Sequence, residues 1–177
     1  MTYLVLFARL LAVGVFAVSG ITKVADRRGF ARSVRDLRMV PRRWVGFTAG
    51  SVIVLEFVAV VLTAVTPIAR VGLVLATALL LGFAGVALVV ARRGVRVPCR
   101  CFGASTTPLG YPQAIRNLVL ALITGTGTLS SVLGVGNNVP AAGMAITALV
   151  AAVGVALVVF FDDLVALFTD ETAHSSP

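Results

Sequence analysis

Five long apolar segments, each close to the length that a helix needs to cross a lipid bilayer, occupy most of the chain. A spanning helix takes about 20 largely apolar residues, because each residue rises ~1.5 Å and the hydrocarbon core is ~30 Å thick. With 59% hydrophobic and 12% charged residues, the chain is also too apolar for a water-soluble fold. We therefore predict an all-α integral membrane bundle whose five transmembrane helices cover roughly residues 3–24, 44–65, 68–91, 113–133 and 141–161.

The division of the chain follows from these segments. Residues 1–161 form a single predicted transmembrane domain, and the more polar residues 162–177 form a tail that we expect to be frayed. The first 22 residues have a competing interpretation as a cleaved signal peptide, with Ala17-Val18-Ser19 as a small-x-small cleavage site. Because Arg9 interrupts the apolar run and no basic residue precedes it, we expect a retained span.

Positive charge is concentrated in two of the connections between spans. Residues 23–43 hold eight Lys and Arg, residues 92–116 hold five, and only Arg9 and Arg70 remain for the other side. Short loops rich in Lys and Arg stay in the cytoplasm, and two spans separate these connections, so both belong on that face. We predict a multi-pass protein of the cell membrane with its N-terminus outside and its C-terminus inside. The net charge of +8 thus indicates topology and a lipid bilayer partner, with no nucleic acid.

The first basic connection also has a helical pattern. Phe30, Val34 and Leu37 follow one another at i, i+4 and i+7, with arginines on the other positions. We predict a short cytoplasmic amphipathic helix that lies on the lipid headgroups and is ended by Pro41.

The only two cysteines, Cys99 and Cys101, lie in the second basic connection with Arg100 between them. Two thiols this close can exchange, and both a neighbouring arginine and the positive end of the following helix favour the reactive thiolate. A disulfide across one residue is a small, strained ring that is easily reduced, which suits exchange. Two buried structural cysteines are the alternative. Metal binding is weaker, because a tetrahedral site needs four ligands and the chain adds only His174; we predict no metal and no cofactor.

Glu56 is the only acidic residue inside a predicted span. A charge at this depth costs a few kcal/mol, so we expect it to have a partner in the bundle. Counted at ~1.5 Å per residue from the cytoplasmic ends, Glu56 lies about 18 Å deep and Arg9 about 22 Å deep. We predict a buried Arg9–Glu56 ion pair, with Lys23 and Arg116 too shallow to reach Glu56. The alternative is that Arg9 extends outward and Glu56 is protonated.

Small residues predict where helices pack closely. Gly46 and Gly50 are spaced as a Gly-x-x-x-Gly motif in the second span, and Gly125 and Gly127 alternate with threonines in the fourth. We expect both sets to lie at helix contacts.

The pattern as a whole resembles the MauE and DoxX-like membrane proteins over about residues 5–160. In the first half the resemblance rests on the runs Arg9 to Gly14 and Ser19 to Lys23, with Phe30, Pro41 and Glu56. In the second half, Cys99-Arg100-Cys101-Phe102-Gly103 followed by Arg116-Asn117 resembles the signature of the methylamine-utilisation protein MauE.

This resemblance implies a role in methylamine metabolism, in the maturation or export of the disulfide-rich small subunit of methylamine dehydrogenase. It implies a thioredoxin-like protein or a disulfide-containing client as partner, with Cys99 and Cys101 reacting. We expect Arg100, Arg116 and Asn117 to support them, the last two by bonding carbonyls of the cysteine loop; a membrane anchor is the alternative for Arg116.

Three functions remain open at this point. The first is a component of thiol-disulfide transfer, and the second is a non-enzymatic scaffold or chaperone with structural cysteines. The third is a small transporter, which is the weakest of the three because the spans lack the paired broken helices of known transporters. One tension accompanies the first hypothesis. The disulfides of an exported client call for access from outside, whereas the arginines place the cysteines inside.

Overall fold

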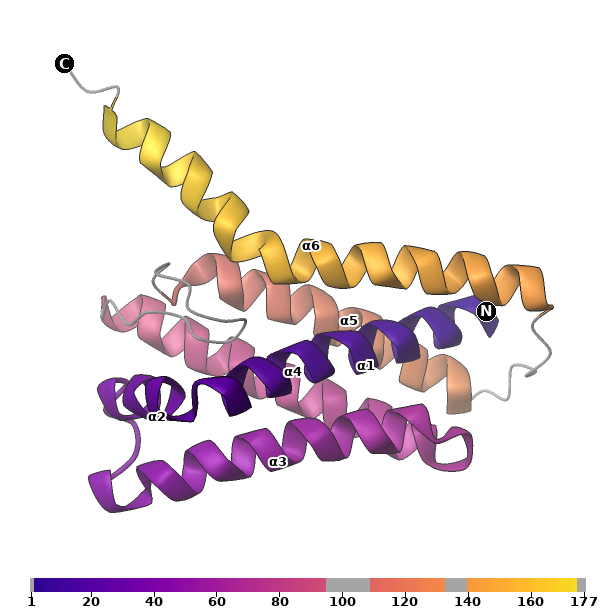
Figure 1. Ribbon diagram of the computed structural model, residues 1–177, viewed down its shortest axis with the longest axis horizontal. Coiled ribbons are helices and arrows are strands. Elements are labelled where there is room, and N and C mark those ends of the chain that lie inside the picture. Colours follow the sequence, from indigo (N-terminus) through magenta and orange to yellow (C-terminus); the bar gives the residue numbers. More distant parts are fainter. Residues whose placement is uncertain (1, 95–108, 133–139, 175–177) are drawn as a thin grey trace.

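The computed structural model describes residues 2–94, 109–132 and 140–174, with side chains as far as Phe161. In these ranges the chain is helical, with no strand, and its elements run in order as a bundle (Figure 1). They are α1 (Thr2–Ala25), α2 (Arg27–Asp36), η1 (Arg42–Trp44), α3 (Val45–Ala64), η2 (Thr66–Ile68), α4 (Ala69–Arg93), α5 (Tyr111–Val132) and α6 (Ala141–His174).

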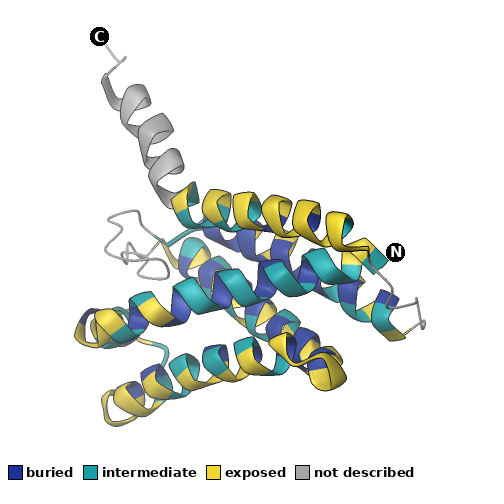
Figure 2. Ribbon diagram, turned by 45° about the vertical axis from the view of Figure 1, so that its right-hand side comes forward, coloured by how far each residue is buried: buried dark blue, intermediate teal, exposed yellow. Residues whose placement is uncertain are grey.

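Among the described residues, five helices are long and apolar enough to span a membrane, which confirms the predicted bundle. Their outer faces carry large apolar side chains, such as Phe47 and Leu122, each 68% exposed, and Leu149, 66% exposed. Figure 2 shows exposed residues along the outer side of α6, the helix least covered by the rest of the bundle. In water such surfaces would be a liability, so these faces belong against lipid.

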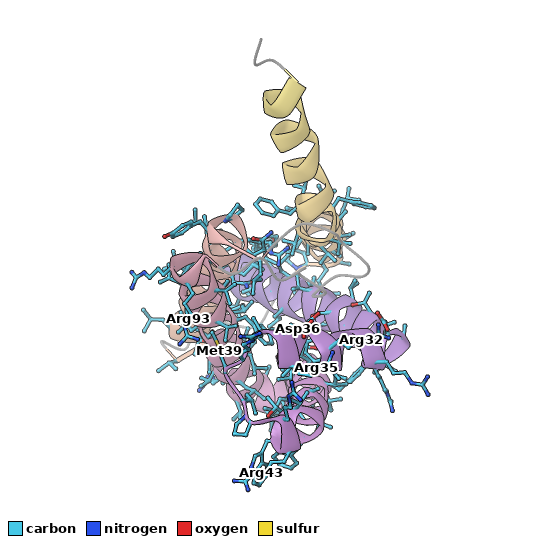
Figure 3. All side chains as sticks on the ribbon, turned by 90° about the vertical axis from the view of Figure 1, so that its left-hand side faces the viewer. Arg32, Arg35, Asp36, Met39, Arg43 and Arg93 are labelled. Carbon is cyan, nitrogen blue, oxygen red and sulfur yellow. The ribbon has the colours of Figure 1, made fainter. Side chains whose placement is uncertain are left out.

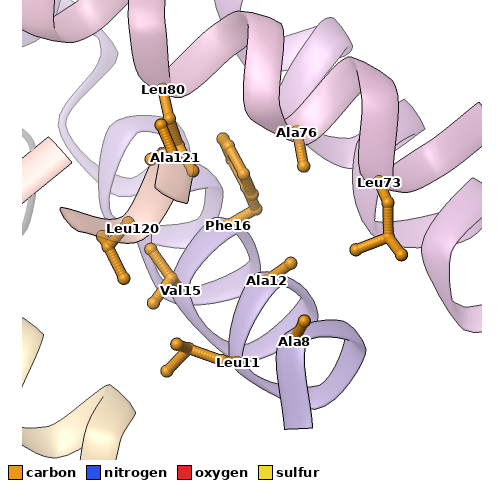
Figure 4. Packing of buried hydrophobic residues seen from close by; sticks show 10 residues of the cluster. All are labelled: Ala8, Leu11, Ala12, Val15, Phe16, Leu73, Ala76, Leu80, Leu120 and Ala121. Carbon is orange, nitrogen blue, oxygen red and sulfur yellow. The ribbon is translucent and has the colours of Figure 1, made fainter. Parts of the chain in front are cut away.

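The core forms where α1, α4 and α5 meet. Figure 4 shows Phe16 of α1 in the middle of this cluster, among side chains from all three helices. Alanines such as Ala8, Ala12 and Ala76 alternate there with larger apolar side chains. Small residues let helices approach closely, and the close packing supplies dispersion energy where lipid removes the hydrophobic driving force. α1 is thereby held at the centre of the bundle.

Of the four glycines predicted at helix contacts, only Gly127 packs tightly, since a Cβ at Gly125 would meet nothing closer than 3.8 Å. A Cβ at Gly127 would lie 2.6 Å from the Cβ of Ala8, so α5 and α1 touch there. By contrast, a Cβ at Gly46 or Gly50 would meet nothing within 4 Å, and both residues are exposed. The prediction for Gly46 and Gly50 is wrong, because they face outward from α3.

α2 forms between the first two spans as predicted, but its surroundings differ. Asp26 caps it by accepting a 2.9 Å hydrogen bond from the Gly29 backbone N–H. Its apolar side, centred on Val34, packs against Val45 and Ala49 in the first turns of α3, so it is covered by protein and not by headgroups. The helix ends at Asp36, before Pro41, because Arg38 takes the left-handed conformation that closes many helices (φ 52°).

The chain also continues farther as helix than the sequence suggests. α6 does not stop at Phe161 but runs to His174, so the prediction of a frayed tail is wrong up to that residue. The reason is local, since an apolar run at 164–168 follows the two aspartates, and no Gly or Pro interrupts the segment before Pro177.

The two ends of the bundle differ in charge. We call "basic end" the end where α1 and α4 finish, α2 lies, and α3 and α5 begin (Figure 1). It carries every described Lys and Arg except Arg9 and Arg70, which belong to the opposite end, where the α3–α4 hairpin turns.

Candidate functional site

A buried ion pair lies inside the bundle toward its basic end. Lys23 of α1 donates to Glu56 Oε1 of α3 over 2.6 Å, and the two residues are 2% and 0% exposed. Ser19, one turn before Lys23, donates to the same oxygen over 3.0 Å and accepts from Lys23 Nζ over 2.5 Å. The three side chains form a closed polar triangle across the α1–α3 contact.

Two aromatic rings complete the surroundings of the lysine. Lys23 Nζ lies 5.4 Å from the ring centroid of Phe30 in α2 and 5.4 Å from that of Phe83 in α4. Both contacts are within cation–π range, and the attraction gains strength away from water. The ammonium group of Lys23 in α1 therefore interacts with side chains of α2, α3 and α4. These contacts connect α2 to three of the spans.

The predicted Arg9–Glu56 pair is wrong, and the direction of the side chains explains why. Side chains lean toward the N-terminus of their helix. In the antiparallel helices α1 and α3, Lys23 thus leans into the bundle and Glu56 leans toward the basic end, so they converge. Figure 1 adds a second reason: α3 begins farther out at the basic end than α1 finishes, so equal counts from the two ends do not give equal depths.

By the same rule Arg9 leans toward the N-terminus of α1, away from Glu56, and it reaches the C-terminal end of α3. Its Nε donates to the carbonyl of Thr63 and its Nη2 to that of Ala64, each over 3.2 Å. These carbonyls belong to the last turn of α3, where they lack partners within the helix, and a cation there also complements the helix dipole. Arg9 is therefore a C-terminal cap supplied by a neighbouring helix.

The first turns of α5 bury three polar side chains at the basic end. Gln113 is 1% exposed, and its Oε1 accepts a 2.9 Å hydrogen bond from the Gly110 backbone N–H just before the helix. Arg116 and Asn117 are each 6% exposed, and the Arg116 guanidinium lies 5.7 Å from the ring centroid of Phe161 in α6. Burial of Arg116 argues against a simple surface anchor. Gln113 was not among the predicted site residues, although its place in the first turn of a span was a signal.

Cys99, Arg100 and Cys101 lie outside the described residues, as do the contacts predicted for them. The segment that holds them leaves α4 after Gly94, whose φ of 64° ends that helix, and it enters α5 through Leu109 and Gly110. Both attachment points lie at the basic end. The cysteine segment is thus anchored at the same end of the bundle as the Lys23–Glu56 pair and the buried start of α5.

The buried charges leave one carboxylate oxygen without a donor. Within the described part of the chain, Glu56 Oε2 has no hydrogen-bond partner, whereas Oε1 has two. A buried charge that is only partly satisfied is costly to disturb. The described residues contain no group of three or more His, Cys, Asp or Glu placed to hold a metal ion.

A helical bundle with lipid-facing outer surfaces, buried charges and two strongly different ends is a multi-pass membrane protein. The chain belongs to the family described as "Methylamine utilisation protein MauE", whose model it matches over residues 1–130. That range takes in the four spans from α1 to α5 almost completely, together with Cys99 and Cys101. No curated protein and no solved structure matches the chain.

Proposed function

We propose that the protein exchanges disulfides with a partner protein through Cys99 and Cys101, as a membrane-bound step in protein maturation. The observation that carries the proposal is the Cys-x-Cys pair in a segment anchored between the ends of α4 and α5, in a chain of the MauE family. The partner is a thioredoxin-like protein or a disulfide-containing client, and the family description connects the process with methylamine use.

The chemistry needs only the two thiols and a partner disulfide. One cysteine thiolate attacks a sulfur of the partner disulfide, which forms a mixed disulfide and releases a partner thiolate that takes up a proton. The second cysteine, after losing its proton to water, attacks the mixed disulfide, which closes the Cys99–Cys101 bond and releases the other partner thiolate. Two electrons pass to the partner, and the reverse sequence oxidises it.

The described residues at the basic end suit this chemistry electrostatically. The start of α5 follows the cysteine segment in the chain, and the N-terminus of a helix carries partial positive charge. Arg116, buried in the second turn, adds a full positive charge at the same end. A cysteine that comes close to these charges would be favoured as the thiolate, which is the attacking species.

Replacing Cys99 or Cys101 singly by serine should trap the exchange at its midpoint. In full-length protein in native membranes, quenched with acid, we expect one single variant to accumulate a mixed disulfide that a reductant removes. The wild-type protein should change from binding two maleimide-polymer labels under reducing conditions to none after oxidation.

A wild-type pair that binds the same number of labels under both conditions would overturn the proposal. The Cys99→Ser/Cys101→Ser variant distinguishes thiol-disulfide exchange from the scaffold alternative. Unchanged maturation of the partner in cells that carry this variant would favour the scaffold. Its thermal unfolding serves as the control that the fold has survived.

We also propose that the basic end faces the cytoplasm in the cell membrane, as the distribution of Lys and Arg favours. In a Cys99→Ser/Cys101→Ser background, Ala25→Cys at the basic end and Ile68→Cys at the opposite end should react oppositely with a membrane-impermeant maleimide. In intact cells we expect Ile68→Cys to be labelled at least about tenfold faster, a ratio that a sealed bilayer easily sustains. Faster labelling of Ala25→Cys would invert the topology and bring the native cysteines to the outside.

A further inference from the structure

The corner between α2 and α3 forms a pocket that none of the preceding roles uses. It has a volume of about 410 Å³. Three arginines, one aspartate and two apolar residues line it: Arg35, Asp36, Arg38, Val40, Pro41 and Arg42. Figure 3 looks onto this end of the bundle and shows Arg35 and Asp36 toward its middle, with Arg32, Arg43 and Arg93 around them. A pocket of this size accommodates a small polar headgroup.

The charge balance of the pocket favours an anion. Asp36 is occupied by its neighbour, since Arg35 Nε lies 3.5 Å from its Oδ1 and both side chains are 53% exposed. Among the residues that the structure describes, Arg38 and Arg42 have no carboxylate partner. Two guanidinium groups therefore share one pocket without a counterion from the protein, and their planar forks match the oxygens of a phosphate group.

The backbone at Arg38 is a second and independent observation. Its φ of 52° makes it the single non-glycine residue with positive φ in the described ranges. The position closes α2 and usually holds glycine, because a Cβ in this conformation costs roughly 1–2 kcal/mol. Strained backbone of this kind clusters at functional sites. Here the strained residue is Arg38, whose guanidinium group lines the pocket.

Exposed aromatic side chains beside the pocket indicate its expected depth in the membrane. Trp44 and Phe47, 48% and 68% exposed, make an edge-to-face contact at the start of α3. Exposed Trp at the end of a span marks the membrane–water interface. Because Arg42 precedes Trp44 by two residues, we expect its side chain at the depth of the phosphodiesters of the adjacent leaflet. If a phospholipid places its phosphate in the pocket, its acyl chains can lie against the exposed apolar face of α3.

We propose that the pocket between α2 and α3 binds the phosphate of an anionic phospholipid headgroup through Arg38 and Arg42. The phosphodiester accepts hydrogen bonds from both guanidinium groups, while Val40 and Pro41 form the apolar wall of the pocket. A bound lipid would fasten the connection that follows α2 to the bilayer, while the apolar side of α2 itself is packed on α3.

The test compares lipids on the purified full-length protein in a neutral detergent, with adducts counted by native mass spectrometry. Phosphatidylglycerol should bind in preference to phosphatidylcholine, and Arg38→Gln/Arg42→Gln should weaken phosphatidylglycerol about tenfold or more, as expected for loss of two charge-assisted contacts. The matched control is Arg27→Gln/Arg28→Gln, which removes the same charge from exposed positions of α2 outside the pocket and should change the affinity less than about twofold. Equal losses in the two variants, or no preference over phosphatidylcholine, would overturn the site.

Two further arms identify the ligand and the role of Arg38. Inorganic phosphate at the same concentration should not displace phosphatidylglycerol; displacement would overturn the assignment to a lipid. Arg38→Gly should weaken phosphatidylglycerol while it raises the melting temperature of the lipid-free protein by about 2–4 °C, because glycine takes the left-handed conformation without strain. A lower melting temperature together with unchanged lipid affinity would show that Arg38 is there for the fold alone.

Discussion

Lys23→Met should be among the most destabilising single substitutions in the bundle, at about 3–5 kcal/mol, because it leaves the Glu56 carboxylate buried without its cation. Glu56→Gln should cost a similar amount, since it strands the ammonium group between Phe30 and Phe83. Unfolding in mixed micelles of a mild and a denaturing detergent, followed by circular dichroism, gives both values.

The double variant Lys23→Met/Glu56→Gln is the decisive measurement. Removing both charges also removes the cost of burying them, so its loss of stability should fall well below the sum of the two single losses. The matched control is the Arg35–Asp36 pair, half exposed at 53% for each side chain, for which Asp36→Asn should change stability by less than about 1 kcal/mol. If the two single losses simply added, Lys23 and Glu56 would not form the pair.

The helices could be predicted from the lengths and spacing of apolar residues in the sequence. The buried ion pair could not, because it depends on the direction in which side chains leave their helices. The five spans and α2 follow from apolar runs of about 20 residues and an i, i+4, i+7 pattern, signals that tertiary packing does not alter. The partner of Glu56 could not be found by counting depth alone. It requires knowing that antiparallel side chains lean toward opposite ends, and that α3 begins farther out than α1 finishes.

Glycine contacts illustrate the same limit. Gly46 and Gly50 match the Gly-x-x-x-Gly motif yet face outward, whereas Gly72, which has no glycine four residues away, is tightly packed. A spacing identifies residues that share one face of a helix, but only the packed bundle decides which face meets a neighbour. For the cysteine segment the limit is different: its chemistry follows from residue type and family, and the described geometry supplies only its two anchoring points at the basic end.

Gly72→Ala should strongly destabilise the opposite end of the bundle. A Cβ at this position would come within 2.6 Å of the Leu62 carbonyl carbon and closer still to the backbone nitrogen of Thr63. Backbone atoms cannot turn aside as a side chain can, so α3 and α4 must separate next to their connecting turn. We expect a loss of about 1–3 kcal/mol for Ala and more for Val in the same micelle unfolding assay, despite the better helix propensity of both residues.

Gly82→Ala, in the same helix, isolates the steric cause. A Cβ there meets nothing within 4 Å, so only the gain in helix propensity remains, and stability should be unchanged or rise by up to about 1 kcal/mol.

Gly72→Ala should also weaken the hydrogen bonds of Arg9, which end on the Thr63 and Ala64 carbonyls beside the same contact. Once α3 has shifted, Arg9→Met should cost less in the Gly72→Ala background than in the wild type. Equal costs in the two backgrounds would show that the hairpin contact and the arginine cap act independently.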